Sequence, residues 1–402
     1  MKRVAITGSG TINALGADVA STYEAFGQGR SGIGALDFRD ADRLSIRIGG
    51  QVHGWAPQDH FNPRQLSLFD RYTEFAVYAA RQAVAQSGLD FQDELGLRSG
   101  VVLGTAGGGV ATGDDSYRAI YEDRKNKVHP FVVPRLMNNA AAAHIAMEWG
   151  LRGPSVTVST ACASANHAMG LAFQMIRSGA VTAMLTGGAE AMLCFGGVKA
   201  WEALRVMSDD ACRPFSANRS GMVMGEGAGI FVFEEWENAR ARGADILAEV
   251  IGFAMTSDAS DIVMPNQDGA QRAMAGAMRD AGLNPDAVGY INAHGSGTMA
   301  NDKTECAAIV QAFGAQAQRL MVSSTKSMHG HLIGGTGAVE LLACLMALRQ
   351  GNIAPTIGYE QPDPDCALDV VPNTARQARV TAVLSNAFGF GGVNAVLALR
   401  KA

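Results

Sequence analysis

The sequence predicts a layered α/β protein. Short β-branched runs that end at glycine, such as residues 101–104 and 291–295, alternate with longer alanine-rich stretches of helical period. Glycine occurs 48 times among 48% hydrophobic residues, which indicates a globular chain with many tight turns and close backbone approaches. The length of 402 residues exceeds the roughly 250 to 300 residues of a usual single core, so we expect two domains or two related halves.

The expected elements follow in chain order. A first strand begins at residue 4, and further strands end near residues 104, 159 and 295. A Gly-x-Gly at residues 8–10 follows the first strand, but Asn13 stands where a dinucleotide-binding fingerprint has its third glycine, so that function is rejected. Helices closed by glycine or a polar turn are expected at 73–87, 166–177, 269–281, 303–313 and 338–350.

A weak internal duplication supports two halves. Residues 159–179 resemble 324–351, and 103–108 resemble 292–298, in the same order within each half. We therefore expect one half at 1–250 and the other at 251–402. Loops at the ends of equivalent strands would then converge on one site from both halves.

Composition excludes several classes of protein. Lys plus Arg is 33 against 38 Asp plus Glu, a net charge of -5, so no overall positive field attracts nucleic acid. No apolar run reaches the roughly 18 residues of a membrane span, and the N-terminus shows no signal-peptide pattern, so a cytoplasmic location is expected. The six cysteines form no C-x-x-C pair, so neither a zinc site nor a disulfide framework is expected.

Cys162 is the candidate nucleophile. It lies where the strand at 155–159 gives way to a helix through small residues, in the manner of a nucleophile elbow. The positive end of the helix dipole and the flanking amide N–H groups would favour the thiolate. The competing interpretation is a buried core cysteine.

Three later segments carry further candidates. His294 lies at a strand end in the segment AHGSGT, and Lys326, His329 and His331 fall within six residues of one small-residue loop. The alternatives are a histidine packed beside a turn and a solvated surface loop. The segment 384–394 places glycines around two phenylalanines, which suits an oxyanion hole, although a bulge at a sheet edge would look similar.

Taken in order, these segments resemble the elongating β-ketoacyl-[acyl-carrier-protein] synthases of fatty-acid and polyketide assembly. The resemblance also includes residues 4–8, 213–215 and 225–228. It implies a thiolase-like fold with two pseudo-symmetric halves in αβαβα layers, and a homodimer, with a heterodimer of related subunits as the alternative. It also implies acyl and malonyl thioesters as substrates, and phosphopantetheine supplied by the acyl-carrier protein in place of a permanently bound cofactor.

The resemblance assigns a role to each candidate. Cys162 receives the acyl chain from the carrier protein, and His294 and His331 stabilise the enolate formed when malonyl-carrier protein loses carbon dioxide. Both histidines should then be neutral. The backbone N–H groups of Cys162 and Phe390 form the oxyanion hole of the condensation step.

Supporting residues are assigned in the same way. Lys326 matches the family lysine, whose ammonium group is expected to pair with Glu305 and to organise the site. Ser296 and Thr298 match hydroxyls that hold the pantetheine arm, and Phe388, in the closing segment 384–394, is a further supporting residue.

Several positions depart from the usual housekeeping pattern. Gly107 and Val132 stand where bulkier residues are common and Trp201 fills an aromatic position, which predicts an acyl pocket for longer or stiffer chains, as in nodulation-type synthases. His329 replaces a frequent threonine and has no assigned role. Local basic residues would attract an acidic carrier protein, and solvated turns are the alternative for each; the candidates are Arg124, Lys125, Lys127, Arg64, Arg71 and Arg205.

Two other classes remain as alternatives. A degradative thiolase should place a second cysteine in the closing segment, where this chain has Phe388 and Phe390. A non-catalytic partner subunit that sets chain length typically lacks the nucleophile. Cys162 and the two histidines argue against that second class, although an active chain can pair with such a subunit.

Overall fold

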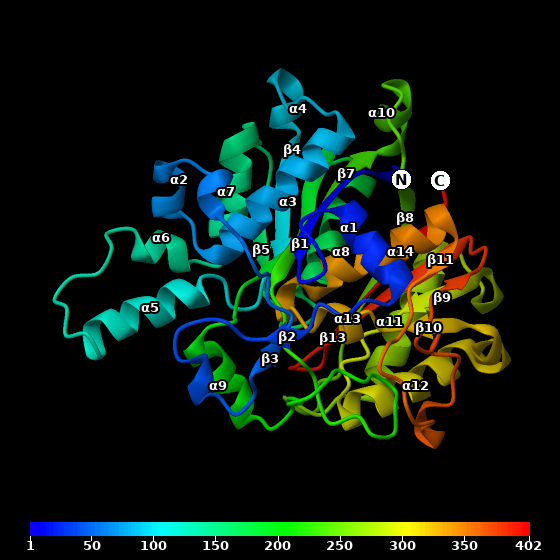
Figure 1. Cartoon of the computed structure of the whole chain (residues 1–402). Coiled ribbons are helices and arrows are strands. Elements are labelled where there is room, and N and C mark those ends of the chain that lie inside the picture. The colour runs from blue at the N-terminus through cyan, green and yellow to red at the C-terminus, as the bar shows by residue number, and fades with distance from the viewer.

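The computed structural model describes all residues from 1 to 402. One ten-stranded sheet runs through the molecule in the order β10-β9-β13-β14-β8-β1-β7-β6-β4-β5 (Figure 1). Its strands are β1 (Val4–Asn13), β4 (Ser99–Gly104), β5 (Ser155–Val158), β6 (Ala183–Glu190), β7 (Gly227–Glu235), β8 (Ala248–Ser257), β9 (Val288–Asn292), β10 (Met321–Ser323), β13 (Ala382–Gly389) and β14 (Val393–Arg400).

The two halves of this sheet have the same topology. From the centre outward, one half reads β1-β7-β6-β4-β5 and the other β8-β14-β13-β9-β10. In each half the first two pairings are antiparallel and the last two are parallel. The predicted pair of related halves is therefore confirmed. The division at residue 250 stays a prediction, and β8, the first strand of the second half, begins at Ala248.

Helices separate and cover the two halves. The central helices α8 (Ser164–Arg177) and α14 (Thr336–Gln350) contact strands of both halves. The outer pair α3 (Arg71–Ser87) and α7 (Ala140–Trp149) covers one half, and α11 (Gln267–Ala281) with α12 (Met299–Phe313) covers the other. Every residue of α14 from Thr336 to Leu348 is buried, as expected for a helix enclosed between the two halves of the sheet. The layers are αβαβα, as predicted.

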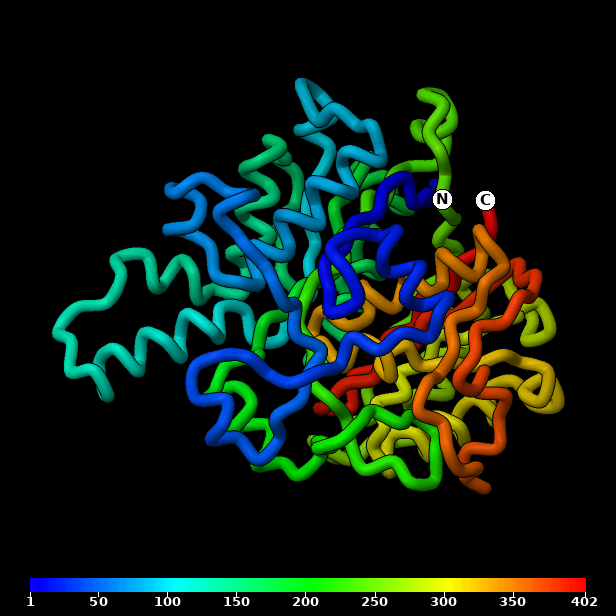
Figure 2. The backbone as a smooth tube through the Cα atoms, in the orientation of Figure 1, coloured from blue at the N-terminus to red at the C-terminus, as the bar shows by residue number.

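The remaining elements surround these layers. Helices α5 (Val110–Tyr121) and α6 (Val132–Leu136) form an arm that projects from the body, and the two termini lie close together on another side (Figure 2). None of the helices has the length and apolar character of a membrane span. The others are α1 (Val19–Gln28), α2 (Pro63–Leu68), α4 (Asp93–Leu97), α9 (Phe195–Ala203), α10 (Trp236–Ala241) and α13 (Lys326–His329), with short strands β2 (Gly34–Ala35), β3 (Ile48–Gly49), β11 (Asn352–Ile353) and β12 (Arg376–Gln377).

The predicted helices end where expected but begin two to four residues earlier. Side-chain caps explain part of the difference, because Asp70, Asn266 and Thr298 accept hydrogen bonds from the first turns of α3, α11 and α12. At the C-terminal ends, glycines such as Gly88 and Gly351 adopt the left-handed conformation that stops a helix.

The Gly-x-Gly near the N-terminus lies inside β1 rather than after it. A Cβ atom on Gly8 would lie 2.0 Å from the carbonyl oxygen of Ala83, and one on Gly10 would lie 2.0 Å from that of Ala79. These glycines therefore let α3 pack directly against the strand, which accounts for them without a nucleotide.

Candidate active site

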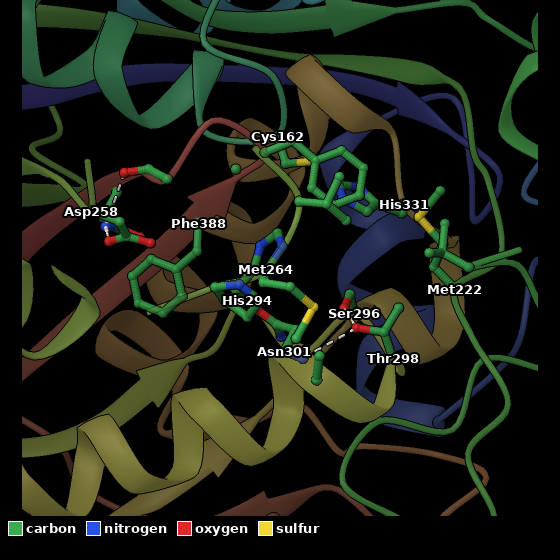
Figure 3. Close-up of a pocket in the computed structure, with 18 of the residues that line it drawn as sticks. Cys162, Met222, Asp258, Met264, His294, Ser296, Thr298, Asn301, His331 and Phe388 are labelled. Carbon is green, nitrogen blue, oxygen red and sulfur yellow. Dashed lines mark hydrogen bonds between the residues drawn. The ribbon is translucent and has the colours of Figure 1, made fainter. Parts of the chain in front are cut away.

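A pocket of about 140 Å³ contains Cys162, with side chains from both halves of the chain around it (Figure 3). Its lining is mainly apolar with a few polar groups, which is typical of a site for an extended organic substrate. The residues that line it are Cys162, Trp201, Val206, Met222, Asp258, Val263, Met264, Pro265, His294, Ser296, Thr298, Ala300, Asn301, His331, Phe388, Gly389, Phe390, Gly392 and Asn394.

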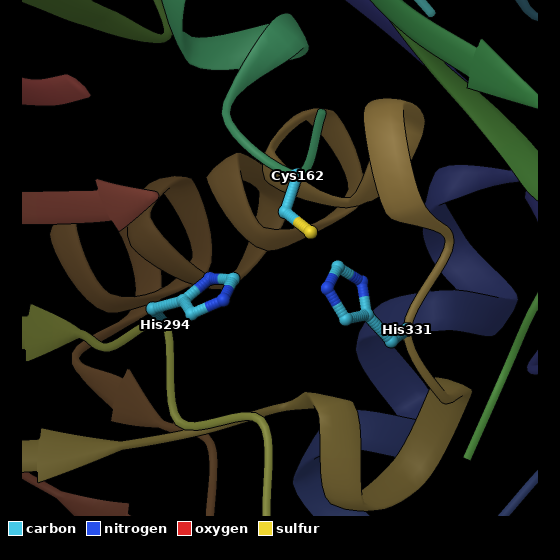
Figure 4. A group of neighbouring side chains, drawn as sticks. All are labelled: Cys162, His294 and His331. Carbon is cyan, nitrogen blue, oxygen red and sulfur yellow. The ribbon is translucent and has the colours of Figure 1, made fainter. Parts of the chain in front are cut away.

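Cys162 lies in the turn between β5 and α8, two residues before the helix. The preceding residue, Ala161, has a φ of 47°, a left-handed value that is uncommon outside glycine. The turn directs the sulfur between two imidazole rings, those of His294 and His331 (Figure 4). One atom of each of the three side chains lies within 4.8 Å of the other two. The predicted nucleophile and both predicted histidines therefore meet at one point.

The resting form of Cys162 is the thiol. Burial raises the pKa of Cys162 to about 11, although the positive charge of Lys326 and hydrogen bonds from the backbone N–H groups of Phe390 and Cys162 act in the opposite direction. The flanking N–H groups therefore favour the thiolate, as expected, but burial outweighs them in the free enzyme. The same two N–H groups face the sulfur, which is where an oxyanion hole for an acyl group on Cys162 has to lie.

The two imidazole rings approach each other edge to face, with centroids 5.4 Å apart and planes at 79°. Burial, followed by the charge of Lys326, lowers the pKa of both His294 and His331 well below 6.5. Both rings are therefore neutral at pH 7, and each offers one N–H donor.

Hydrogen bonds fix which nitrogen of His331 carries the proton. Its Nδ1 accepts from the backbone N–H of Ile333 at 3.1 Å, and the Thr336 hydroxyl lies 2.8 Å from the same atom. Because Nδ1 is an acceptor, the proton of the neutral ring must be on Nε2. Nε2 therefore donates a hydrogen bond and has no free lone pair for a metal ion. On His294, Nδ1 has no hydrogen-bond partner.

Lys326 is fully buried and pairs with a different carboxylate from the one predicted. Its Nζ donates to the backbone carbonyl of His294 and to Glu340 Oε1, both at 2.5 Å. Burial raises the pKa of Glu340 to about 7, against the opposing effect of Lys326. The expected Lys326–Glu305 pair is wrong because α14 presents Glu340 to the lysine, whereas Glu305 on α12 is engaged elsewhere.

Glu305 holds the backbone of the histidine loop. Its two carboxylate oxygens accept from the N–H groups of His294 at 2.9 Å and Gly295 at 2.7 Å. Asn386 donates to the same carboxylate at 3.1 Å. Glu305 therefore supports the site as expected, but through the peptide backbone instead of the lysine.

The other predicted residues that line the Cys162 pocket carry hydroxyl groups or aromatic rings. Ser296 and Thr298 line the pocket with their hydroxyl oxygens 2.9 Å apart. Phe388 lies beside His294, with ring centroids 6.0 Å apart, and Phe390 stacks on Trp201 at 5.8 Å. Hydroxyls and aromatic faces thus border the approach to Cys162.

Two predicted acyl-pocket residues lie outside the Cys162 pocket. Gly107 borders a separate groove with Gly196 and Gly197, and a Cβ on Gly107 would lie 2.2 Å from Met192 Cε. The volume that the glycine was expected to release is therefore already occupied by Met192. Val132 lies on the projecting arm and borders another cavity there.

The basic candidates behave differently from one another. Arg71 is committed within the fold, since it forms two hydrogen bonds to Glu226 and one to the carbonyl of Val52. Lys125 lies 3.3 Å from Asp123. The others are exposed and have no ion pair; these are Arg64, Arg124, Lys127 and Arg205, the last next to the pocket residue Val206.

Three buried polar residues close to the site had no usable signal or role in the sequence. Glu340 and Glu190 each stand in an ordinary helical or strand pattern, so only the folded chain reveals them. His329 does not face the pocket: its Nδ1 lies 2.7 Å from the carbonyl of Gly330 and its Nε2 lies 3.0 Å from the Thr325 hydroxyl. Burial lowers the pKa of His329 to about 3. His329 is therefore neutral, and its two hydrogen bonds stabilise the loop that carries Lys326.

The chain is similar to known β-ketoacyl synthases along most of its length. Residues 1–239 match the family model "Beta-ketoacyl synthase, N-terminal domain" and residues 247–360 match "Beta-ketoacyl synthase, C-terminal domain". The chain is 45% identical over 400 residues to Nodulation protein E of Rhizobium sp. (strain N33), covering 100% of this chain and 99% of that protein. It is 41% identical over 407 residues to 3-oxoacyl-[acyl-carrier-protein] synthase 2 of Staphylococcus aureus (strain N315), covering 100% and 98%.

A solved structure described as the ishigamide ketosynthase/chain length factor superimposes with a TM-score of 0.94 at 37% identity, covering 100% of this chain and 99% of that one. The layered halves and the cysteine between two histidines define a condensing enzyme of thiolase-like fold, an acyltransferase. The chain belongs to the β-ketoacyl synthase family.

Proposed function

We propose that this chain is a 3-oxoacyl-[acyl-carrier-protein] synthase whose acyl group is carried on Cys162. The observation that supports this best is the position of the Cys162 sulfur between two neutral histidines. Neutral N–H donors stabilise a developing enolate, whereas a histidine that had to act as a strong base would be arranged beside a carboxylate.

In the first half-reaction the Cys162 sulfur attacks the acyl thioester of the carrier protein. The sulfur forms the new thioester bond, the phosphopantetheine thiol leaves, and the proton of Cys162 goes to that thiolate. Because the pKa of Cys162 is about 11, the proton has to be removed as the acyl group arrives, and the N–H groups of Cys162 and Phe390 stabilise the tetrahedral oxyanion.

In the second half-reaction malonyl-carrier protein loses carbon dioxide, and the electron pair of the broken C–C bond forms an enolate at the thioester. His294 and His331 donate hydrogen bonds to the enolate oxygen. The enolate carbon then attacks the Cys162 thioester, and the sulfur leaves as a thiolate that takes up a proton from solvent to restore the thiol, giving a 3-oxoacyl chain longer by two carbons. Ser296 and Thr298, at the mouth of the pocket, hold the pantetheine arm.

The acyl-carrier protein is the proposed partner of the exposed basic residues. Arg124, Lys127 and Arg205 are exposed and without ion pairs, and Arg205 directly precedes the pocket residue Val206 in the chain. Such cations steer an acidic partner without forming part of the chemistry. Arg64 and Lys125 complete the proposed contact.

We further propose that two chains associate through β5 and the arm. β5 is an edge strand with Val156 43% exposed, and the arm exposes Tyr121 at 70% and Val133 at 67%. An uncovered edge strand beside exposed apolar side chains suits a second copy. A related subunit is the alternative partner, and the cytoplasmic location stays a prediction.

Intact mass after incubation with acyl-carrier thioesters tests the proposed function. Wild type should gain the acyl mass, and Cys162→Ala should not. The same assay addresses the non-catalytic chain-length subunit, which would gain no acyl mass. Failure of wild type to load, or persistence of the adduct in Cys162→Ala, overturns the proposal.

A further inference from the structure

Glu190, the last residue of β6, is fully buried and accepts hydrogen bonds from two different loops. On one loop, Ala106 N–H donates to Oε2 at 2.7 Å, and Gly107 N–H at 3.2 Å and the Thr105 hydroxyl at 3.0 Å donate to Oε1. On the other loop, Gly334 N–H donates to Oε2 at 3.1 Å. One carboxylate therefore joins two segments that are more than two hundred residues apart in the chain.

No cation compensates this buried carboxylate. All of its donors are backbone N–H groups and one hydroxyl, and burial raises its pKa to about 7. A buried carboxylate without a counter-ion is costly, and four donors offered to two oxygens are what offsets that cost here. A glutamine in its place has only one acceptor oxygen, and its NH2 group would face N–H donors that it cannot bind.

The first loop, residues 105–108, adjoins the nucleophile. Ala106 and Met192 pack against the apolar cluster that contains Cys162. Gly107 borders the groove on the far side of Met192. An acyl chain that enters this apolar cluster from Cys162 therefore meets the loop that Glu190 holds.

The second loop sets the orientation of His331. Ile333, whose N–H donates to His331 Nδ1, has a φ of 45°, a strained value for a β-branched residue. Such a conformation persists only where its neighbours hold it. The next residue, Gly334, is held by Glu190, and a Cβ there would lie 2.3 Å from the Ala106 nitrogen. The two loops thus touch backbone to backbone.

We propose that Glu190 is a positioning residue that couples the acyl chain on Cys162 to the orientation of His331. The acyl chain displaces or orders residues 105–107, and the hydrogen bonds of Glu190 pass this movement on to Gly334. The neighbouring Ile333, whose N–H group orients His331, then shifts with it. Enolate stabilisation is then strongest when an acyl acceptor is already in place. The inference rests on the proposed function, because it needs both half-reactions.

Glu190→Gln tests this coupling through release of carbon dioxide from malonyl-carrier protein, measured separately on acylated and unacylated enzyme. Wild type should decarboxylate faster when Cys162 is acylated, by on the order of tenfold. In Glu190→Gln, the ratio of acylated to unacylated rates should fall toward one while Cys162 still accepts the acyl chain. A merely structural role would slow both rates together and leave the ratio unchanged.

Two further variants keep the test decisive. Thr105→Val removes one donor and leaves the carboxylate, so it should lower the ratio in part even where Glu190→Gln does not fold. Glu249→Gln, a buried carboxylate paired with Arg3 and Arg400 far from the site, should keep the wild-type ratio. A wild-type ratio of one, or wild-type ratios in Glu190→Gln and Thr105→Val, overturns the coupling. Absence of acyl loading in wild type overturns the proposed function instead.

Discussion

Lys326 Nζ donates a hydrogen bond to the backbone carbonyl of His294, and the same ammonium group is paired with Glu340. One charge therefore ties the histidine loop of the second half to the buried central helix α14. The same charge also lowers the pKa of His294 and His331, although burial lowers it more. The lysine organises the site without facing the reacting atoms.

Lys326→Met should destabilise the protein by about 3 kcal/mol, because it leaves the buried Glu340 carboxyl without its partner. Adding Glu340→Gln should recover much of this loss, since no unpaired charge then remains. Adding Glu305→Gln should recover nothing, because Glu305 binds backbone N–H groups. Chemical unfolding of the three variants checks the pairing, and equal recovery by both second changes would contradict it.

The sequence predicted the cysteine and the two histidines that meet in the pocket better than the residues that support them. Cys162 and His294 each follow the end of a strand and His331 lies in a loop just after Gly330, so their positions follow from short-range rules. The partner of Lys326 could not be predicted in that way, because Glu305 and Glu340 lie on different helices and only the packing of α12 and α14 decides between them. Gly107 shows the same limit, since the space beside it depends on Met192, a residue distant in the chain.

His294→Ala should still accept an acyl chain on Cys162 but decarboxylate malonyl-carrier protein on the order of 10²- to 10³-fold more slowly, the usual effect of losing one oxyanion donor. The acyl adduct is read by intact mass and the second step by release of carbon dioxide. His60→Ala is the matched control, because His60 stacks on Trp55 at 4.8 Å, outside the site. Normal condensation by His294→Ala would contradict the assigned role.

The length of the acyl product should respond to Met192 and to Gly107 in opposite directions. Met192→Ala removes the side chain between the Cys162 cluster and the glycine groove, so longer products are expected. Gly107→Phe adds volume where Met192 already lies, so the longest product should shorten. Mass analysis of products from Met147→Ala, an exposed methionine on α7, provides the control. An unchanged product profile in both variants would show that the chain runs elsewhere.

Alkylation of Cys162 by iodoacetamide should accelerate about tenfold for each pH unit between pH 7 and pH 10, because only the thiolate reacts and the pKa of Cys162 is about 11. An unperturbed thiol would level off above its ordinary pKa of about 8.5. Mass analysis of the Cys162 peptide follows the reaction, with Cys162→Ala to correct for other cysteines. A plateau by pH 9 would mean that the helix terminus outweighs burial.

His329 should make the protein less stable in mild acid. Its pKa is about 3 in the folded chain against an ordinary 6.5, so the unfolded chain binds a proton below pH 6.5 that the folded chain does not. Stability is therefore fully present above pH 6.5 and falls as the pH decreases, by about 2 kcal/mol at pH 5 for this one residue.

Lys326 is the charged group that also lowers the pKa of His329 after burial, and the carbonyl of Gly330 opposes both. His329→Gln should lose about 2 kcal/mol less than wild type between pH 7.5 and pH 5, measured by urea unfolding at each pH. The comparison of variant with wild type cancels the other titrating groups. These include His294 and His331, whose lowered pKa values act in the same direction, and Glu190 and Glu340, whose raised pKa values act in the opposite one. Identical losses in variant and wild type would show that His329 is protonated in the folded chain.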